Sequence, residues 1–292
     1  MTEINQETCK KCGLCAKACA AKIIVEIEGE FRVVPYPDWG CVECGLCMAV
    51  CPTKSILVPG FNYDDFSRLP RTKLGFDSVY DMLLCRRSVR SYKKDPVPRD
   101  ILNSIVQATA TAPMGVPPST VEVLIFDKRD DIEELLIDVA KDYEGLLFMM
   151  GNPVLRQILR LSHSSIMYNS IKKHVVPAAR LCLENRKNGR DTFTYGAPAV
   201  LLFHIEKRGE SISEDCWIAA SYASVAAQSL GLGSSFIGMI PPIVDRNKKL
   251  KAKLSIPNEN RVFACMIVGY SDIKFTRMIP RELGGVSYFS DE

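Results

Sequence analysis

Eight of the twelve cysteines of this chain fall into two stretches with the same spacing, C-x2-C-x2-C-x3-C. In such a run three thiolates reach one [4Fe–4S] cluster from a tight loop, and the fourth ligates the other cluster of a pair. Zinc ribbons instead use two C-x2-C pairs for each metal ion. The spacing therefore favours two iron–sulfur clusters over zinc. The candidate ligands are Cys9, Cys12, Cys15, Cys19, Cys41, Cys44, Cys47 and Cys51.

These two stretches resemble the bacterial ferredoxins, whose small domain carries two [4Fe–4S] clusters. Residues 1–60 form the corresponding domain, and apolar segments 23–27 and 31–34 predict a hairpin between the quartets. A domain so largely devoted to clusters indicates electron transport, with a purely structural role as the alternative. Exchange of the fourth cysteine predicts one cluster on Cys9, Cys12, Cys15 and Cys51 and the other on Cys41, Cys44, Cys47 and Cys19.

Length and composition limit the remaining possibilities. A chain of 292 residues accommodates two domains, and its 47% hydrophobic and 24% charged content is that of a globular protein. A net charge of +3 is too small to indicate a nucleic-acid partner or a membrane surface. No apolar run approaches the ~20 residues of a spanning helix, and no signal peptide is evident. We therefore expect a cytoplasmic protein, with no nucleic-acid and no membrane partner.

The second stretch that carries chemistry is Arg86-Arg87-Ser88-Val89-Arg90-Ser91-Tyr92. It follows residues 61–77, whose prolines, glycines and mixed charges predict a linker, and a helix predicted from about Ser78, where Ser78-x-x-Asp81 resembles a capping box. Three arginines with two serines make a compact donor array that suits a dianionic phosphate. A solvated basic helix end has the same composition and is the alternative interpretation.

A predicted helix over residues 99–111, a loop over 112–119 and a strand over 121–126 come next. In this order the chain resembles the nitroreductase family, FMN enzymes with an R-R-S-x-R-x-[FY] phosphate motif. The resemblance implies FMN contacts from Arg86, Arg87, Ser88 and Arg90.

The loop at residues 112–119 corresponds to the family's A-P-S-x-x-N-x-Q-P-W-like loop, which lies against the flavin. Pro117 and Ser119 stand here at the usual Asn and Gln positions, and Val121 stands at the Trp position. The resemblance therefore implies flavin contacts from this loop in which backbone groups of Met114 and Gly115 take part.

The rest of the chain continues the resemblance. Residues 231–238 match the family's G-L-G-[ST]-x-x-I-G segment, which implies that Ile237 and Gly238 pack against the flavin, and Arg281 matches a late basic residue that returns to the phosphate.

Apolar runs at residues 199–205 and 262–269 predict two further strands, and Ser211 with Glu214 forms a capping-box pattern. The small residues of the helix that this pattern opens, predicted over 215–230, correspond to the family's dimer helix. We expect an α+β fold in which residues 78–292 form an FMN domain with a central, mostly antiparallel sheet surrounded by helices.

Together these parts predict an FMN-dependent oxidoreductase with two [4Fe–4S] clusters, acting as a homodimer. An external donor, ferredoxin or NAD(P)H, supplies electrons that pass through the clusters to FMN and on to a small nitroaromatic or quinone-like substrate. No side chain is assigned as a catalytic acid or base. An electron carrier that serves a partner protein is the alternative, and a redox sensor without turnover is a third hypothesis.

Overall fold

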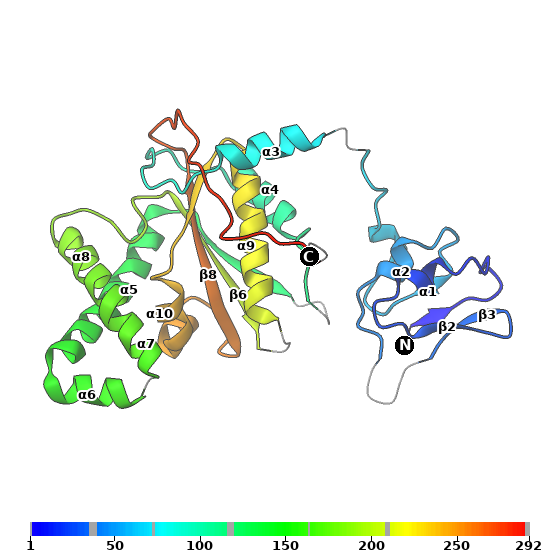
Figure 1. The fold of residues 1–292 in the computed structure, drawn as a ribbon, viewed down its shortest axis with the longest axis horizontal. Coiled ribbons are helices and arrows are strands. Elements are labelled where there is room, and N and C mark those ends of the chain that lie inside the picture. The colour runs from blue at the N-terminus through cyan, green and yellow to red at the C-terminus, as the bar shows by residue number, and fades with distance from the viewer. Residues whose placement is uncertain are drawn as a thin grey trace.

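The computed structural model describes residues 2–34, 40–71, 74–115, 120–162, 164–207 and 211–289. The first elements build a small lobe from two short antiparallel sheets and two short helices (Figure 1). Its apolar core includes the fully buried side chains of Ile23, Met48 and Ile56. The elements are β1 (Glu3–Ile4), α1 (Leu14–Ala18), β2 (Ile24–Ile27), β3 (Glu30–Val33), α2 (Leu46–Ala49), β4 (Ile56–Leu57) and η1 (Tyr63–Asp65).

The two halves of this lobe cross over each other. β1 pairs with β4, so that Ile4 lies opposite Ile56 and the first half of the lobe is joined to the last strand of the second. β2 pairs with β3 as the predicted hairpin, with Ile24 opposite Val33.

The larger domain is built on a four-stranded, fully antiparallel sheet of order β5-β6-β8-β7. Its strands lie where the apolar runs predicted them, and β7 adds an edge strand beyond them. They are β5 (Val121–Phe126), β6 (Ala199–Glu206), β7 (Gly233–Phe236) and β8 (Asn260–Gly269).

Helices cover both faces of this sheet, which explains why β6 is apolar at nearly every position. Successive side chains of a strand point to opposite faces. Val200 and Leu202 pack into the core beneath the α5 and α8 helices, whereas Leu201 and Phe203 pack into the core beneath α4 and α9. The helices are α3 (Phe76–Cys85), α4 (Arg99–Thr109), α5 (Arg129–Gly151), α6 (Pro153–Ser162), α7 (Ser165–Ser170), the π-helical η2 (Ile171–Val175), α8 (Val176–Lys187), α9 (Ile212–Ser229), α10 (Pro241–Arg246) and α11 (Lys248–Lys253).

Two helix starts differ from the sequence prediction. α3 begins at Phe76, with Gly75 at its N-cap, so the Ser78-x-x-Asp81 pattern lies inside the helix rather than capping it. Ser211 is the N-cap of α9, but its side chain caps no backbone amide. The Oγ of Ser213 donates to the carboxylate of Glu214 instead, at 2.8 Å, so the predicted capping box does not form.

In the described part of the chain, no hydrogen bond or ion pair joins residues 2–66 to residues 76–289.

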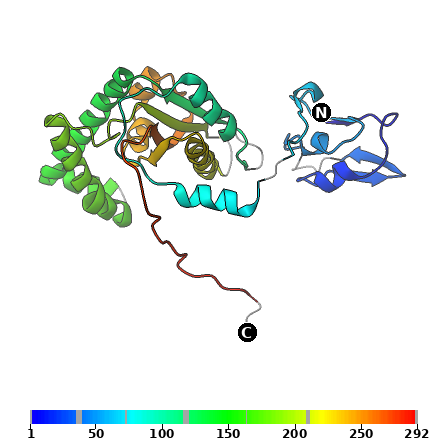
Figure 2. The ribbon, with the colours of Figure 1, turned by 90° about the horizontal axis from the view of Figure 1, so that it is seen from above.

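Residues 272–289 contain no helix or strand and run away from the sheet (Figure 2). Large apolar side chains in this segment face solvent; Leu283 and Val286 are 80% and 73% exposed. None of the described helices combines the length and the apolar character needed to cross a lipid bilayer.

Candidate functional site

The lobe gathers its eight clustered cysteines into two groups, and each group combines a triplet from one half with the fourth cysteine of the other. Each group lines a separate small cavity. The first group is Cys9, Cys12, Cys15 and Cys51, and the second is Cys41, Cys44, Cys47 and Cys19. The crossed pairing of β1 with β4 brings each trailing cysteine to the opposite triplet.

Left-handed backbone turns aim amide groups at the sulfurs. Lys11 and Glu43 occupy equivalent places in the two loops and have φ angles of 55° and 52°. Their N–H groups donate to the Sγ atoms of Cys9 and Cys41, each at 3.4 Å. Gly13 and Gly45 follow with φ of 73° and 71°, a region in which glycine is unstrained.

The cysteine groups fit clusters better than single metal ions. Among the described residues, no three His, Cys, Asp or Glu side chains lie close enough to hold one metal ion. Four sulfurs spread around a cavity suit an inorganic core with several irons. Burial, together with the sulfurs of Cys41 and Cys44, raises the pKa of the Cys47 thiol to about 11. Iron bound at this site would stabilise the buried Cys47 thiolate, because the cation takes the place of the proton.

In the larger domain, the basic motif runs as an extended segment along β7. The N–H of Val89 donates to the carbonyl of Ser234 at 3.0 Å, and Ser88 forms a parallel bridge with Ser234. The side chains therefore alternate. Arg87 and Val89 line a cavity of about 610 Å³, whereas Arg86, Ser88 and Arg90 do not face that cavity.

This contact depends on a glycine. A Cβ atom at Gly233 would lie 2.5 Å from the Cγ2 atom of Val89, closer than van der Waals packing permits. We expect Gly233→Ala to lower the stability of the larger domain by about 1–3 kcal/mol through overpacking. Thermal unfolding checks this. Because the Cβ atom of Val89 would itself lie 2.8 Å from the new Cβ, Val89→Gly rather than Val89→Ala should restore part of the loss in the same chain. No recovery in the double variant would contradict the proposed contact.

The charge of Arg281 acts on Arg86, although 194 residues separate them in the sequence. Burial lowers the pKa of the half-buried Arg86 guanidinium, and the charges of Arg281 and Arg87 lower it further. Neither Arg86 nor Arg281 forms an ion pair within the described residues. A cluster of like charges without a counter-ion binds an anion such as phosphate favourably. We name Arg86, Ser88, Arg90 and Arg281 the cradle.

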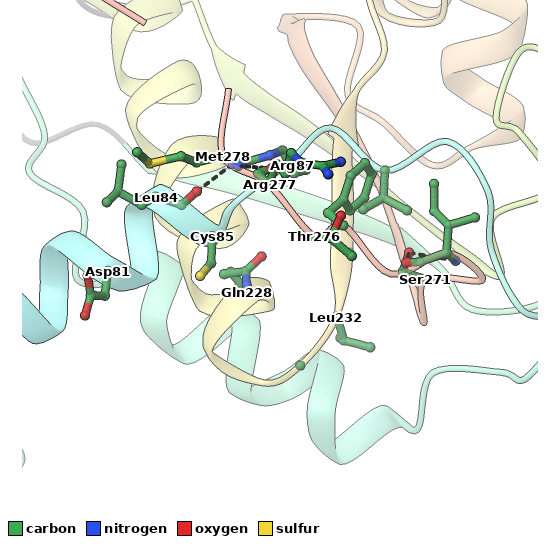
Figure 3. Close-up of a pocket in the computed structure, with 15 residues that line it drawn as sticks. Asp81, Leu84, Cys85, Arg87, Gln228, Leu232, Ser271, Thr276, Arg277 and Met278 are labelled. Carbon is green, nitrogen blue, oxygen red and sulfur yellow. Dashed lines mark hydrogen bonds between the residues drawn. The ribbon is translucent and has the colours of Figure 1, made fainter. Parts of the chain in front are cut away.

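Arg87 has a different role from its neighbours in the motif. Its guanidinium donates to the carbonyl of Arg86 at 2.8 Å and to the carbonyl of Arg277 at 3.1 Å. Figure 3 shows it at the cavity wall beside Arg277, with Gln228 from the last turn of α9 and Leu232 just beyond that helix on another side. Arg87 thus ties the C-terminal segment to the end of α3.

Arg90 has a partner that sequence reasoning did not assign to the site. Its guanidinium carbon lies 5.9 Å from the ring centroid of Tyr195, a cation–π contact. Tyr195 has a φ of 54°, which costs energy for a residue other than glycine. Asp191 stabilises this turn because it accepts the N–H of Gly196 at 3.1 Å and pairs with Arg129 at 2.8 Å. The Asp-x-x-x-Tyr-Gly pattern is the signal that was available in the sequence.

The remaining predicted contacts lie in two places. Ile237 is buried and Gly238 is exposed just beyond β7, the strand that borders the basic motif. The N–H of Gly115 donates to the carboxylate of Asp215 at 2.8 Å, in the first turn of α9, with Met114 next to it. Since Gln228 at the other end of α9 lines the Arg87 cavity, about 20 Å of helix separates Gly115 from the cradle region. Pro117 and Ser119 lie outside the described residues.

Comparison with known proteins gives two family matches. The model of the nitroreductase family matches residues 83–270, and that of the 4Fe-4S dicluster domain matches residues 8–56. A relative, the iodotyrosine deiodinase of Thermotoga neapolitana, is 25% identical over 194 residues, which cover 66% of this chain and 89% of the relative.

Solved structures share the fold of the larger domain. A nitroreductase with bound FMN from Bacteroides fragilis has a TM-score of 0.53 at 22% identity and covers 72% of this chain and 97% of its own. A BluB-like flavoprotein from Clostridium difficile has a TM-score of 0.52 at 16% identity and covers 70% and 94%. The expected fold class, both resemblances and the class of FMN-dependent oxidoreductase with iron–sulfur clusters are confirmed at the family level. The chain belongs to the nitroreductase family and carries a 4Fe-4S dicluster domain ahead of its nitroreductase domain.

Proposed function

We propose that this protein passes electrons from an external low-potential donor through two [4Fe–4S] clusters to FMN, and from FMN to a small oxidised substrate of nitroaromatic or quinone type. The observation that carries the proposal is an anion cradle without a counter-ion in the same chain as two crossed cysteine groups. FMN supplies the link between one-electron donors and a two-electron product. The residues of the chain bind the cofactors and exclude competing ligands.

Arg86 and Arg281 bind the FMN phosphate in this proposal, and Ser88 donates a hydroxyl hydrogen bond from the same face. Arg90 completes the cradle, held against the ring of Tyr195. Arg87 keeps the motif attached to the C-terminal segment through its carbonyl contacts. Gly238, beyond the strand that borders the motif, offers an uncovered backbone to the flavin ring, and the buried Ile237 supports it from the core.

A second copy of the chain completes the site in this proposal. Met114 and Gly115 lie at the opposite end of α9 from the Arg87 cavity, so one chain does not bring them to its own cradle. The exposed side chains of Trp217 and Tyr222 on α9, and the apolar C-terminal segment, offer surface for a homodimer. Met114 and Gly115 of each protomer then approach the flavin of its partner.

Anaerobic stopped-flow spectroscopy tests the electron route. With reduced ferredoxin as donor, we expect cluster absorbance to bleach first and flavin absorbance second, followed by oxidation when a nitro compound or a quinone is added. With NADH as donor, flavin reduction should be the slower process. Rapid reduction of the flavin by NADH, with clusters that stay oxidised, would overturn the proposed direction. Reduction of the flavin without turnover of any small oxidant would favour an electron carrier.

A further inference from the structure

The two cluster loops have the same backbone but opposite charge. Cys9-Lys10-Lys11-Cys12 and Cys41-Val42-Glu43-Cys44 occupy equivalent places in the two halves of the lobe. The third residue is left-handed in both, with φ of 55° at Lys11 and 52° at Glu43. The first loop thus carries two positive charges where the second carries one negative charge. Because the backbones match, the charge difference follows from the side chains alone.

The lysines of the first loop are free to meet a partner. Lys10 and Lys11 are exposed, and neither forms an ion pair within the described residues. Lys10 also lines the cavity of the Cys9 group, so its charge lies beside the expected cluster. Glu7 is the nearest acidic residue in the sequence and leaves the segment net positive.

Other charges do not explain this asymmetry. Lys54 and Lys22 occupy equivalent places after the two trailing cysteines, each with φ close to 55°. Lys54 lies over the ring of Tyr63, and Lys22 donates to the carbonyl of Lys17 at 3.1 Å. Each half therefore has one such lysine, and the contrast between the two loops remains.

We propose that the surface formed by the Cys9–Cys12 loop docks an acidic one-electron carrier protein and that the Cys9 group receives its electron. The inference rests on the proposed function, since it names the donor that feeds the same route. One electron leaves the carrier and enters the cluster, with no bond formed and no proton moved. Complementary charge raises the rate of encounter by about 10- to 1000-fold at low ionic strength. A hydride donor gains nothing here, because a cluster accepts single electrons.

The test gives the first loop the charge of the second loop. Lys10→Val with Lys11→Glu installs the residues of the second loop, and Glu43 shows that glutamate occupies this left-handed turn. With a reduced acidic [2Fe–2S] ferredoxin as the carrier, we expect cluster reduction to slow by about tenfold or more at low salt. With a cationic viologen radical as donor, reduction should become faster, because repulsion is removed. A purely structural defect would slow both reactions.

Binding provides a readout independent of electron transfer. Calorimetric titration with oxidised [2Fe–2S] ferredoxin should show wild-type binding that weakens with salt and a roughly tenfold weaker Kd for the Lys10/Lys11 variant. The matched control, Val42→Lys with Glu43→Lys, should stay within about twofold of wild type in ferredoxin binding. If the control gains as much ferredoxin affinity as the Lys10/Lys11 variant loses, the assignment is overturned. It is also overturned if ferredoxin reduces the clusters of variant and wild type at the same rate.

Failure of this proposal is distinct from failure of the proposed function. Cluster absorbance reports docking, whereas flavin absorbance reports the onward route. Clusters that bleach with the expected dependence on Lys10 and Lys11, beside a flavin that stays oxidised, would support the docking surface and contradict the route. A flavin reduced through the clusters at the same rate in wild type and variant would support the route and overturn the docking surface.

Discussion

Arg86→Ala with Arg281→Ala is expected to release FMN while both clusters stay in place. Charge-assisted hydrogen bonds contribute about 1.5–3 kcal/mol each, so loss of two arginines should weaken FMN binding by about 100-fold or more. Burial lowers the pKa of the Arg86 guanidinium, and the charge of Arg281 lowers it further. Removal of both guanidinium groups therefore eliminates repulsion in the flavin-free protein. Flavin absorbance after desalting, together with a fluorescence titration, measures the effect.

Two controls separate lost binding from lost structure. The melting temperature of the flavin-free double variant should equal or exceed that of flavin-free wild type, since a like-charge pair has been removed. Arg277→Ala is the matched control, because the contact of Arg277 with Arg87 uses its backbone carbonyl and survives the substitution. Unchanged flavin content in the double variant would refute the phosphate assignment.

Single cysteine replacements should reveal the crossed ligand sets as two spectroscopic classes. Wild-type protein prepared anaerobically should hold about eight irons per chain, the content of two [4Fe–4S] clusters. Cys9→Ser and Cys51→Ser should impair the same cluster, and Cys41→Ser and Cys19→Ser should impair the other. This pairing follows from the cavities that each set of sulfurs lines. Electron paramagnetic resonance of the reduced protein, with iron analysis, separates the classes.

The outcome at Cys19 decides whether the sets cross. If Cys19→Ser changes the same signal as Cys9→Ser, each half of the lobe binds its own cluster and the assignment is wrong. Cys182→Ser is the control, since Cys182 is buried in the core of the larger domain and faces neither cavity. It should leave about eight irons in place.

Short-range patterns predicted much of this molecule. Cysteine spacing predicted the ligand loops, because a C-x2-C-x2-C turn has little choice of conformation once its residues surround one centre. Apolar runs predicted β6 and β8, since a strand buried on both faces needs an apolar side chain at nearly every position. The edge strand β5 is only partly buried. Turn chemistry was less informative. Ser211 is an N-cap whose side chain caps no backbone amide, and the Glu214 carboxylate accepts from the Ser213 hydroxyl.

Which residues belong to the cradle depends on contacts between distant parts of the chain, so the sequence alone could not predict it. Arg87 belongs to the same motif as Arg86, but the bridge to β7 turns alternate side chains to opposite sides, and Arg87 binds backbone carbonyls at the cavity. Tyr195 reaches Arg90 only because Asp191 stabilises a left-handed turn.

Motif spacing therefore specified which residue types can bind a cluster or a phosphate, because a short motif by itself places these side chains near one another. The pairing of strands that are distant in sequence decided which of the candidate residues come together. It brought Cys51 to Cys9. Side-chain contacts placed the other residues: Arg87 holds the C-terminal segment that carries Arg281, and Asp215 holds Gly115 at the far end of α9. The physical reason is that local conformational preferences are set by neighbours along the chain, whereas the packing of β6 and β8 depends on the whole buried core.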